Sequence, residues 1–189
     1  MAHRVTVMNN LLHKNSKDIV SFLLKRFNVE KFWYRAYISK IEDKFDEEIE
    51  ASDLSDLENI YKQYKNKDPR YLISFQSKVL VNGEFRHFPM IDFSNSIVKD
   101  INLEKVRSVL RHLGEKEGFI LNSGRCFHYY GNKLITSDKW ITFTEDCKKY
   151  PEIGENYPNR QLGRGKSSLR LVVNERKPKN PEVIEIYRI

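Results

Sequence analysis

The stretch FILNSGRCFHYYG (119–131) is the part of the sequence that most narrows the choice of fold. Two apolar runs with strand-like composition, FIL (119–121) and CFHYY (126–130), flank a segment of turn-forming residues, NSGR (122–125). Apolar and aromatic runs separated by such a turn are typical of a β-hairpin. The sequence therefore predicts two antiparallel strands in this part of the chain.

Successive side chains of the second of these strands should point to opposite faces of the sheet. The alternation places Cys126, His128 and Tyr130 on one face, and Phe127 and Tyr129 on the other. His128 thus shares a face with a small thiol, which leaves room for a ligand beside the imidazole. The alternative is a plain hairpin whose strand carries a half-buried histidine.

The turn of this hairpin contains residues suited to an anion. Gly124 permits tight backbone geometry, and the side chains of Ser123 and Arg125 offer hydrogen-bond donors to a phosphate. We expect a phosphate contact here if the hairpin serves a nucleotide site.

Asp92 stands near the end of another strand-like run, HFPMIDF (87–93). A carboxylate in such a run is costly unless it is exposed, paired or bound to a metal. Ser94 lies two residues further on and should face the same way. The plainer alternative is that Asp92 and Ser94 close a turn.

Elsewhere the apolar spacing predicts helices in five places. They are expected after a cap at Ser16, around Trp33, Tyr37 and Ile41, at 54–65, between a cap at Asn102 and a stop at Gly118, and after a cap at Ser137. Strands are expected at 71–75, 79–81 (before an Asn82–Gly83 turn), 87–93, 169–173 and 183–189, with a polar loop at 149–168. The order favours a single α+β domain, with a helical N-terminal part (1–69) and a sheet core (70–189). In this domain helices pack on one face of one largely antiparallel sheet.

The composition is that of an ordinary globular protein of 189 residues, 40% hydrophobic and 31% charged. No run of 18 apolar residues and no apolar signal core occurs, so we expect no membrane contact and a cytoplasmic location. Cys126 and Cys147 belong to no metal-binding spacing and are expected to be free thiols.

The net charge of +7 is unevenly spread along the chain. Nine acidic residues lie between Ile41 and Glu58, whereas seven basic residues lie between Arg160 and Lys179. The basic stretch suits a nucleotide or nucleic acid, and the alternative is a solvated face with a basic loop. GRGKSS (163–168) is not a phosphate-binding P-loop, because Arg160 occupies the position where that motif requires its first glycine.

Three segments, in this order, resemble the catalytic core of archaeo-eukaryotic primases and primase-polymerases. MIDFS (90–94) resembles the family's acidic strand motif, SGRCFH (123–128) its small-x-His strand, and LRLVVNERKPKNPEVIEI (169–186) its Leu-Arg strand. The resemblance implies a sheet like that of an RNA-recognition fold and a site for a nucleoside triphosphate. It also implies nucleotidyl transfer that uses Mg²⁺ or Mn²⁺.

The same resemblance implies roles for individual residues. Asp92 and His128 would be catalytic, and Asp92 and Glu155 would bind the metal. The phosphates would be bound by the turn and by two cationic strand positions, namely Ser123, Gly124, Arg125, His128 and Arg170. The basic loop would bind DNA or RNA through Arg160, Arg164 and Lys166.

The sequence departs from the family pattern at Ser94, which stands where the first motif usually has its second acid. For the third acid, spacing favours Glu155 over Asp138 and Asp146. A site short of carboxylates leaves two other hypotheses open. One is a non-catalytic module that binds nucleotide or nucleic acid, and the other is an interaction protein whose acidic segment (41–58) contacts a basic partner.

Overall fold

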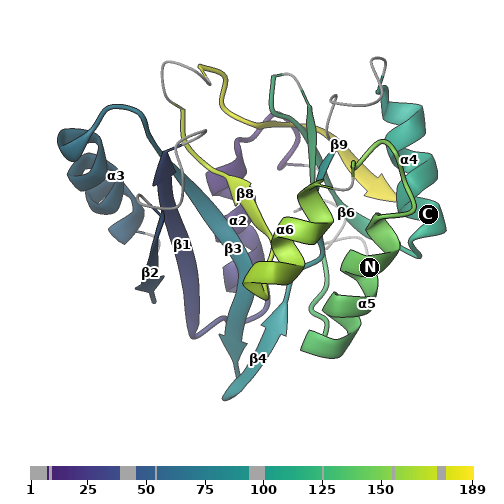
Figure 1. Ribbon diagram of the computed structural model, residues 1–189, viewed down its shortest axis with the longest axis horizontal. Helices are drawn as coiled ribbons and strands as arrows, with labels where there is room; N and C mark the ends of the chain where they lie inside the picture. Colours follow the sequence, from purple (N-terminus) through teal and green to yellow (C-terminus); the bar gives the residue numbers. More distant parts are fainter. Residues whose placement is uncertain are drawn as a thin grey trace.

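The computed structural model describes residues 8, 10–38, 46–53, 55–93, 101–124, 126–154, 156–173 and 178–189. These residues form two antiparallel sheets and five helices (Figure 1). The predicted α+β class with antiparallel strands is therefore confirmed, but the strands divide between two sheets. Within the described part of the chain, no helix is long and apolar enough to cross a membrane.

The first sheet has five strands in the order β2-β1-β3-β4, with β8 also paired to β3. Their bounds are Lys31–Ile38 (β1), Asp46–Ala51 (β2), Tyr71–Val81 (β3), Glu84–His87 (β4) and Ser168–Arg170 (β8). The two strands expected at 71–75 and 79–81 are thus one continuous strand, β3. The predicted turn follows it, because Asn82 and Gly83 have φ values of 50° and 74°, the left-handed geometry of a two-residue hairpin.

Strand β1 corrects the expectation of a helix around Trp33. Phe32, Tyr34, Ala36 and Ile38 are buried and the residues between them are less so, which is the period of a strand. Aromatic and apolar residues on both faces of this segment concealed the alternation in the sequence. The N-terminal part is therefore not purely helical, since β1 and β2 belong to the first sheet.

The second sheet has four strands in the order β5-β7-β6-β9. Their bounds are Met90–Phe93 (β5), Glu117–Asn122 (β6), Phe127–Gly131 (β7) and Glu182–Arg188 (β9). Strands β6 and β7 form the predicted hairpin. The strand expected at 87–93 is divided between β4 and β5 around Pro89, which has no N–H to donate to a ladder. This break is where the chain passes from one sheet to the other.

The five described helices are α2 (Ser16–Arg26), α3 (Asp56–Lys67), α4 (Leu103–His112), α5 (Ser137–Cys147) and α6 (Asn156–Arg164). Asn102 caps α4 as predicted. The caps of α2 and α5 are Asn15 and Thr136, each one residue before the serine expected in that role. Asn15 is favoured because it forms a reciprocal capping box with Asp18.

Helix α6 lies within the segment that was expected to be a polar loop, 149–168. Pro158 is tolerated in its first turn, where a backbone N–H has no helical partner, and Gly165 follows its end with φ of 68°. Figure 1 shows α6 and α2 on opposite faces of the first sheet. Of the basic residues in this segment, Arg160 and Arg164 are held on the helix and Lys166 lies beyond it.

The core has two clusters that meet at the second sheet. On β7, Tyr130 packs into the first cluster and Tyr129 into the second, which confirms the predicted alternation. Gly118, expected as a helix stop, lies in β6, where a Cβ would be 2.4 Å from the ring of Tyr129. Gly114, with φ of 73°, follows the end of α4 instead.

Candidate active site

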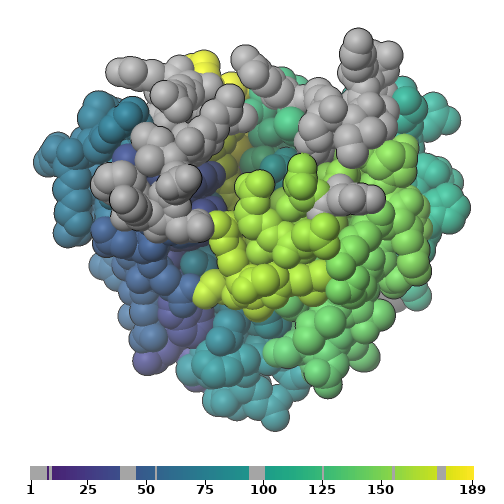
Figure 2. All heavy atoms as spheres, in the orientation of Figure 1, coloured from purple at the N-terminus to yellow at the C-terminus, as the bar shows by residue number. Residues whose placement is uncertain are grey.

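A cavity of about 210 Å³ opens where the two sheets and α6 meet. Figure 2 shows α6 at the surface of the molecule, between the residues of the first sheet and α5. The charged residues that line the cavity are four arginines, His128 and one carboxylate: Arg35, Arg160, Arg164, Arg170, His128 and Asp92. This lining has an excess of positive charge, which suits an anionic ligand.

Asp92 and His128 face each other across neighbouring strands. They are direct partners in the β5–β7 register, and the Nε2 of His128 lies 3.7 Å from Oδ1 of Asp92. The histidine side chain is 6% exposed and the aspartate side chain 39% exposed. The two residues to which the family resemblance gives catalytic roles therefore line one cavity. Cys126, the predicted small neighbour, lines the same cavity.

Arg170 is anchored by the backbone around it. Its Nη1 donates to the carbonyl oxygens of Val172 at 3.2 Å and Lys179 at 2.9 Å, and its Nη2 donates to that of Ser123 at 3.0 Å. Burial lowers the pKa of this guanidinium, and the nearby Tyr37 opposes that effect. Arg170 therefore ties β8 to the turn between β6 and β7 while it lines the cavity.

The turn between β6 and β7 has the geometry that the sequence predicted. Gly124 has φ of 106°, and its N–H donates to Oδ1 of Asn122 at 2.8 Å. The Ser123 hydroxyl donates to the carbonyl of Cys126 at 2.9 Å, and Ser123 lines the cavity. Three residues singled out in the sequence, Arg125, Glu155 and Ser94, lie outside the described residues.

The three basic residues expected to form one loop are separated by the structure. Arg160 and Arg164 lie on α6 and line the cavity, whereas Lys166 lies beyond the helix and is not part of the lining. The phenol of Tyr157 donates to the carbonyl of Met90 at 3.1 Å and so fixes α6 to β5. Burial raises the pKa of Tyr157 and keeps this donor neutral.

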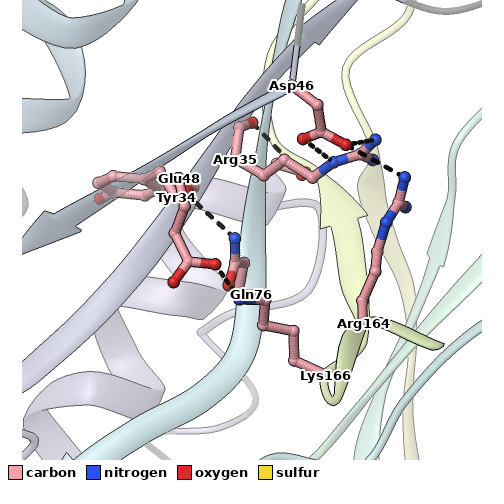
Figure 3. A network of polar contacts seen from close by, with 8 residues as sticks. Tyr34, Arg35, Asp46, Glu48, Gln76, Arg164 and Lys166 are labelled. Atoms are coloured by element: carbon pink, nitrogen blue, oxygen red, sulfur yellow. Dashed lines mark hydrogen bonds and ion pairs between the residues drawn. The ribbon is translucent and has the colours of Figure 1, made fainter. Parts of the chain in front are cut away.

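The acidic strand β2 supplies partners to the basic residues at the rim (Figure 3). Asp46 accepts two hydrogen bonds of 2.6 Å from Arg35 and one of 3.1 Å from Arg164. Burial alone would raise the pKa of Asp46, but the hydrogen bond and charge of Arg35, aided by Arg164, lower it. Glu48 is paired with Lys166. The described part of the acidic segment therefore contacts basic residues of its own chain.

Arg35 and Tyr37 are lining residues that the sequence did not single out. Both were assigned to a helix, on which they would not have faced the cavity together. In strand β1 they share a face, and the guanidinium carbon of Arg35 lies 4.2 Å from the centre of the Tyr37 ring. Alternation along 31–38 was the signal that could have revealed them.

The described residues do not by themselves provide a site for the divalent metal ions that primases typically use. Asp92 is the one carboxylate among the described residues of the lining. No group of three or more histidine, cysteine, aspartate or glutamate side chains that could hold a metal occurs in the described ranges. A divalent ion needs several oxygen ligands to offset its charge, so the described donor set does not fit it.

The structure thus defines an antiparallel α+β protein with an arginine-lined cavity built around an aspartate–histidine pair. A sequence model of the family described as "AEP-like: Archaeo-eukaryotic primase 1D-like" matches residues 50–182, more than two thirds of the chain. The chain belongs to this archaeo-eukaryotic primase-like family, which confirms the resemblance seen in its motifs.

A solved structure to which this chain is similar is the "catalytic domain of primase Repb' in complex with initiator DNA". The two sequences are 8% identical, the match covers 91% of this chain and 85% of that one, and the TM-score is 0.44. A search of curated proteins found no match.

Proposed function

We propose that the cavity binds the phosphates of a nucleoside triphosphate and that the chain is a primase-like nucleotidyltransferase domain acting on DNA or RNA. The observation that carries the proposal is the Asp92–His128 pair, which faces a cavity lined by four arginines. Membership of the primase-like family supports it independently.

The electrostatics of the cavity favour a polyphosphate over a neutral or cationic ligand. Guanidinium groups present N–H donors in a planar fork that matches two oxygens of a phosphate. Arg160 and Arg164 come from one helix, whereas Arg35 and Arg170 come from two strands of the first sheet. Cations therefore approach a bound phosphate chain from several sides, in a partly buried site where charge interactions are stronger than in water.

His128 and Asp92 would act at the other side of the ligand. His128 lines the cavity, and an imidazole N–H would donate to a phosphate oxygen. Asp92 lines the same cavity, and its Oδ1, 3.7 Å from the Nε2 of His128, would help to orient the imidazole. The family resemblance assigns Asp92 and Glu155 to a divalent metal, but Asp92 by itself does not provide a metal site, so the proposed phosphate binding does not depend on a bound ion.

A second candidate function is a non-catalytic module that binds nucleotide or nucleic acid on the same fold. The single carboxylate among the described lining residues favours it, because metal-dependent transfer depends on a cluster of acids. Template-dependent incorporation of nucleotides with Mn²⁺ separates the two candidates, since only the first requires it.

The direct test is a titration of the protein with a nucleoside triphosphate, with and without Mn²⁺. His128→Ala should weaken triphosphate binding by about tenfold, because a charge-assisted hydrogen bond to a phosphate is lost. The matched control is His112→Ala, on the exposed side of α4 beside Tyr150, which should leave the affinity unchanged. Equal affinities for the wild type and His128→Ala would remove His128 from the site.

A further inference from the structure

The edge strand β2 directs one carboxylate into a fork made by two arginines from other elements (Figure 3). Arg35 of β1 donates to both oxygens of Asp46, through Nε and Nη2, and Arg164 of α6 donates a third hydrogen bond. The three side chains are 15–24% exposed, so the cluster borders solvent without being freely solvated. Two cations thus share one anion at the rim of the cavity.

A phosphodiester could take the place of this carboxylate without a change in the donors. Both groups are monoanions with two equivalent oxygens, and the guanidinium fork binds either of them. Arg35 does not depend on Asp46 for its position, because its guanidinium also lies over the ring of Tyr37. The donor arrangement would therefore persist if Asp46 moved away.

A second ion pair lies one step further along β2. Glu48 lies two residues after Asp46, hence on the same face, and pairs with Lys166. Alternate residues of a strand are about 7 Å apart. This is the spacing of successive phosphates along an extended nucleic-acid strand, and it is wider than that of adjacent phosphates in a triphosphate.

We propose that Arg35 and Arg164 form a second phosphate-binding site, for a backbone phosphodiester of a nucleic-acid strand, and that Asp46 is its internal occupant. The inference rests on the proposed function, because the same two arginines line the cavity assigned to the triphosphate. A nucleic-acid strand that enters this site replaces the carboxylate of Asp46 with a phosphodiester. Binding to the wild type therefore releases fewer counterions than the number of basic residues suggests.

The test compares Asp46→Asn with the wild type in binding a labelled single-stranded oligonucleotide over a range of salt concentrations. The variant keeps the shape of the side chain and removes its charge, so no internal anion competes. We expect binding about tenfold tighter at low salt, with a log–log salt slope steeper by about 0.7, the value for one more neutralised phosphate on a single strand.

The matched control is Glu50→Gln, the same loss of charge on the same strand. Glu50 pairs with Lys31 at 2.7 Å, and neither residue lines the cavity. Its oligonucleotide affinity should stay within about twofold of the wild type, the effect of net charge alone. An equal gain in both variants would overturn the proposal, because the effect would then be one of net charge.

Two further measurements keep the assignment testable. A parallel titration with inorganic tripolyphosphate should show a smaller gain for Asp46→Asn, and a gain for tripolyphosphate alone would assign the site to the triphosphate. Arg164→Gln, which leaves Asp46 in place, should weaken oligonucleotide binding, and an unchanged affinity would exclude the site. None of these measurements involves His128, so a failure of the triphosphate proposal would be seen separately.

Discussion

The two sides of the cavity hold their arginines in different ways. On one side, here called the anchored side, Arg170 donates to three backbone carbonyl oxygens. On the other, the ion-paired side, Arg35 and Arg164 donate to the carboxylate of Asp46. Backbone acceptors cannot leave without a change in the fold, whereas a side-chain carboxylate on an edge strand can be replaced by another anion. The existing partner of an arginine thus decides how a ligand can bind it: at Arg35 and Arg164 the ligand must displace an anion, whereas at Arg170 it adds to contacts that stay in place.

The largest effect should come from the anchored side. Arg170→Ala leaves the carbonyls of Val172, Lys179 and Ser123 without these donors, in a region where Arg170 itself is 7% exposed. Unsatisfied buried acceptors cost about 1–3 kcal/mol each, so we expect a loss of roughly 3 kcal/mol or more in the free energy of unfolding. Urea denaturation measures it. Arg164→Ala is the comparison on the ion-paired side and should cost about 1 kcal/mol or less. Similar losses of stability in the two variants would contradict the distinction between the anchored side and the ion-paired side.

A pH effect of intermediate size comes from His87, a buried residue at the end of β4 that is not among the lining residues. Its Nδ1 is 3.2 Å from the hydroxyl of Ser77, and its ring stacks on Trp140 at 4.8 Å. Burial, with a smaller contribution from Lys78, lowers the pKa of His87 from 6.5 to about 4. The unfolded chain therefore binds this proton at a higher pH than the folded chain does.

Stability should fall as the pH drops from 6.5 to 4, by roughly 3 kcal/mol from this residue. His87→Gln removes the titrating group and should flatten the profile over that interval. His112→Gln, on the exposed side of α4, is the control for loss of a histidine. If both variants keep the wild-type slope, His87 is not the group responsible.

The smallest expected effect is a loss of stability at low pH, which should come from the ion-paired side. Arg35 and Arg164 hold the pKa of Asp46 below its usual value of 3.8, so the pair stabilises the fold above that pH. The contribution disappears as the pH falls through the lowered pKa in the folded state, and in this partly exposed site it should be below about 1 kcal/mol. Asp46→Asn in the His87→Gln background should reduce the remaining acid sensitivity below pH 4. The backbone carbonyls that accept hydrogen bonds from Arg170 do not titrate in this range, so these hydrogen bonds should contribute nothing to that sensitivity.

Much of the strand that carries His128 was predictable because its signals are local. The turn residues between 122 and 125 and the alternation of 126–130 placed His128 on the cavity face, and the apolar run before Asp92 gave the partner strand. Their direct pairing in the structure follows from two neighbouring antiparallel strands. By contrast, the helix expected around Trp33 was wrong, because apolar residues on both faces obscured a period of two.

The sequence by itself determined the hairpin, the Asn82–Gly83 turn, the Asn102 cap and the motifs that place the chain among primase-like proteins. Each of these depends on residues a few positions apart, whose backbone preferences act before any tertiary contact forms. The tertiary structure alone decided that Arg35, Asp46 and Arg164 meet, since Asp46 and Arg164 are 118 positions apart. The sequence does not specify which opposite charge a charged side chain will contact. The pairing of β1 with β2 and the packing of α6 over the first sheet bring Arg35, Asp46 and Arg164 together.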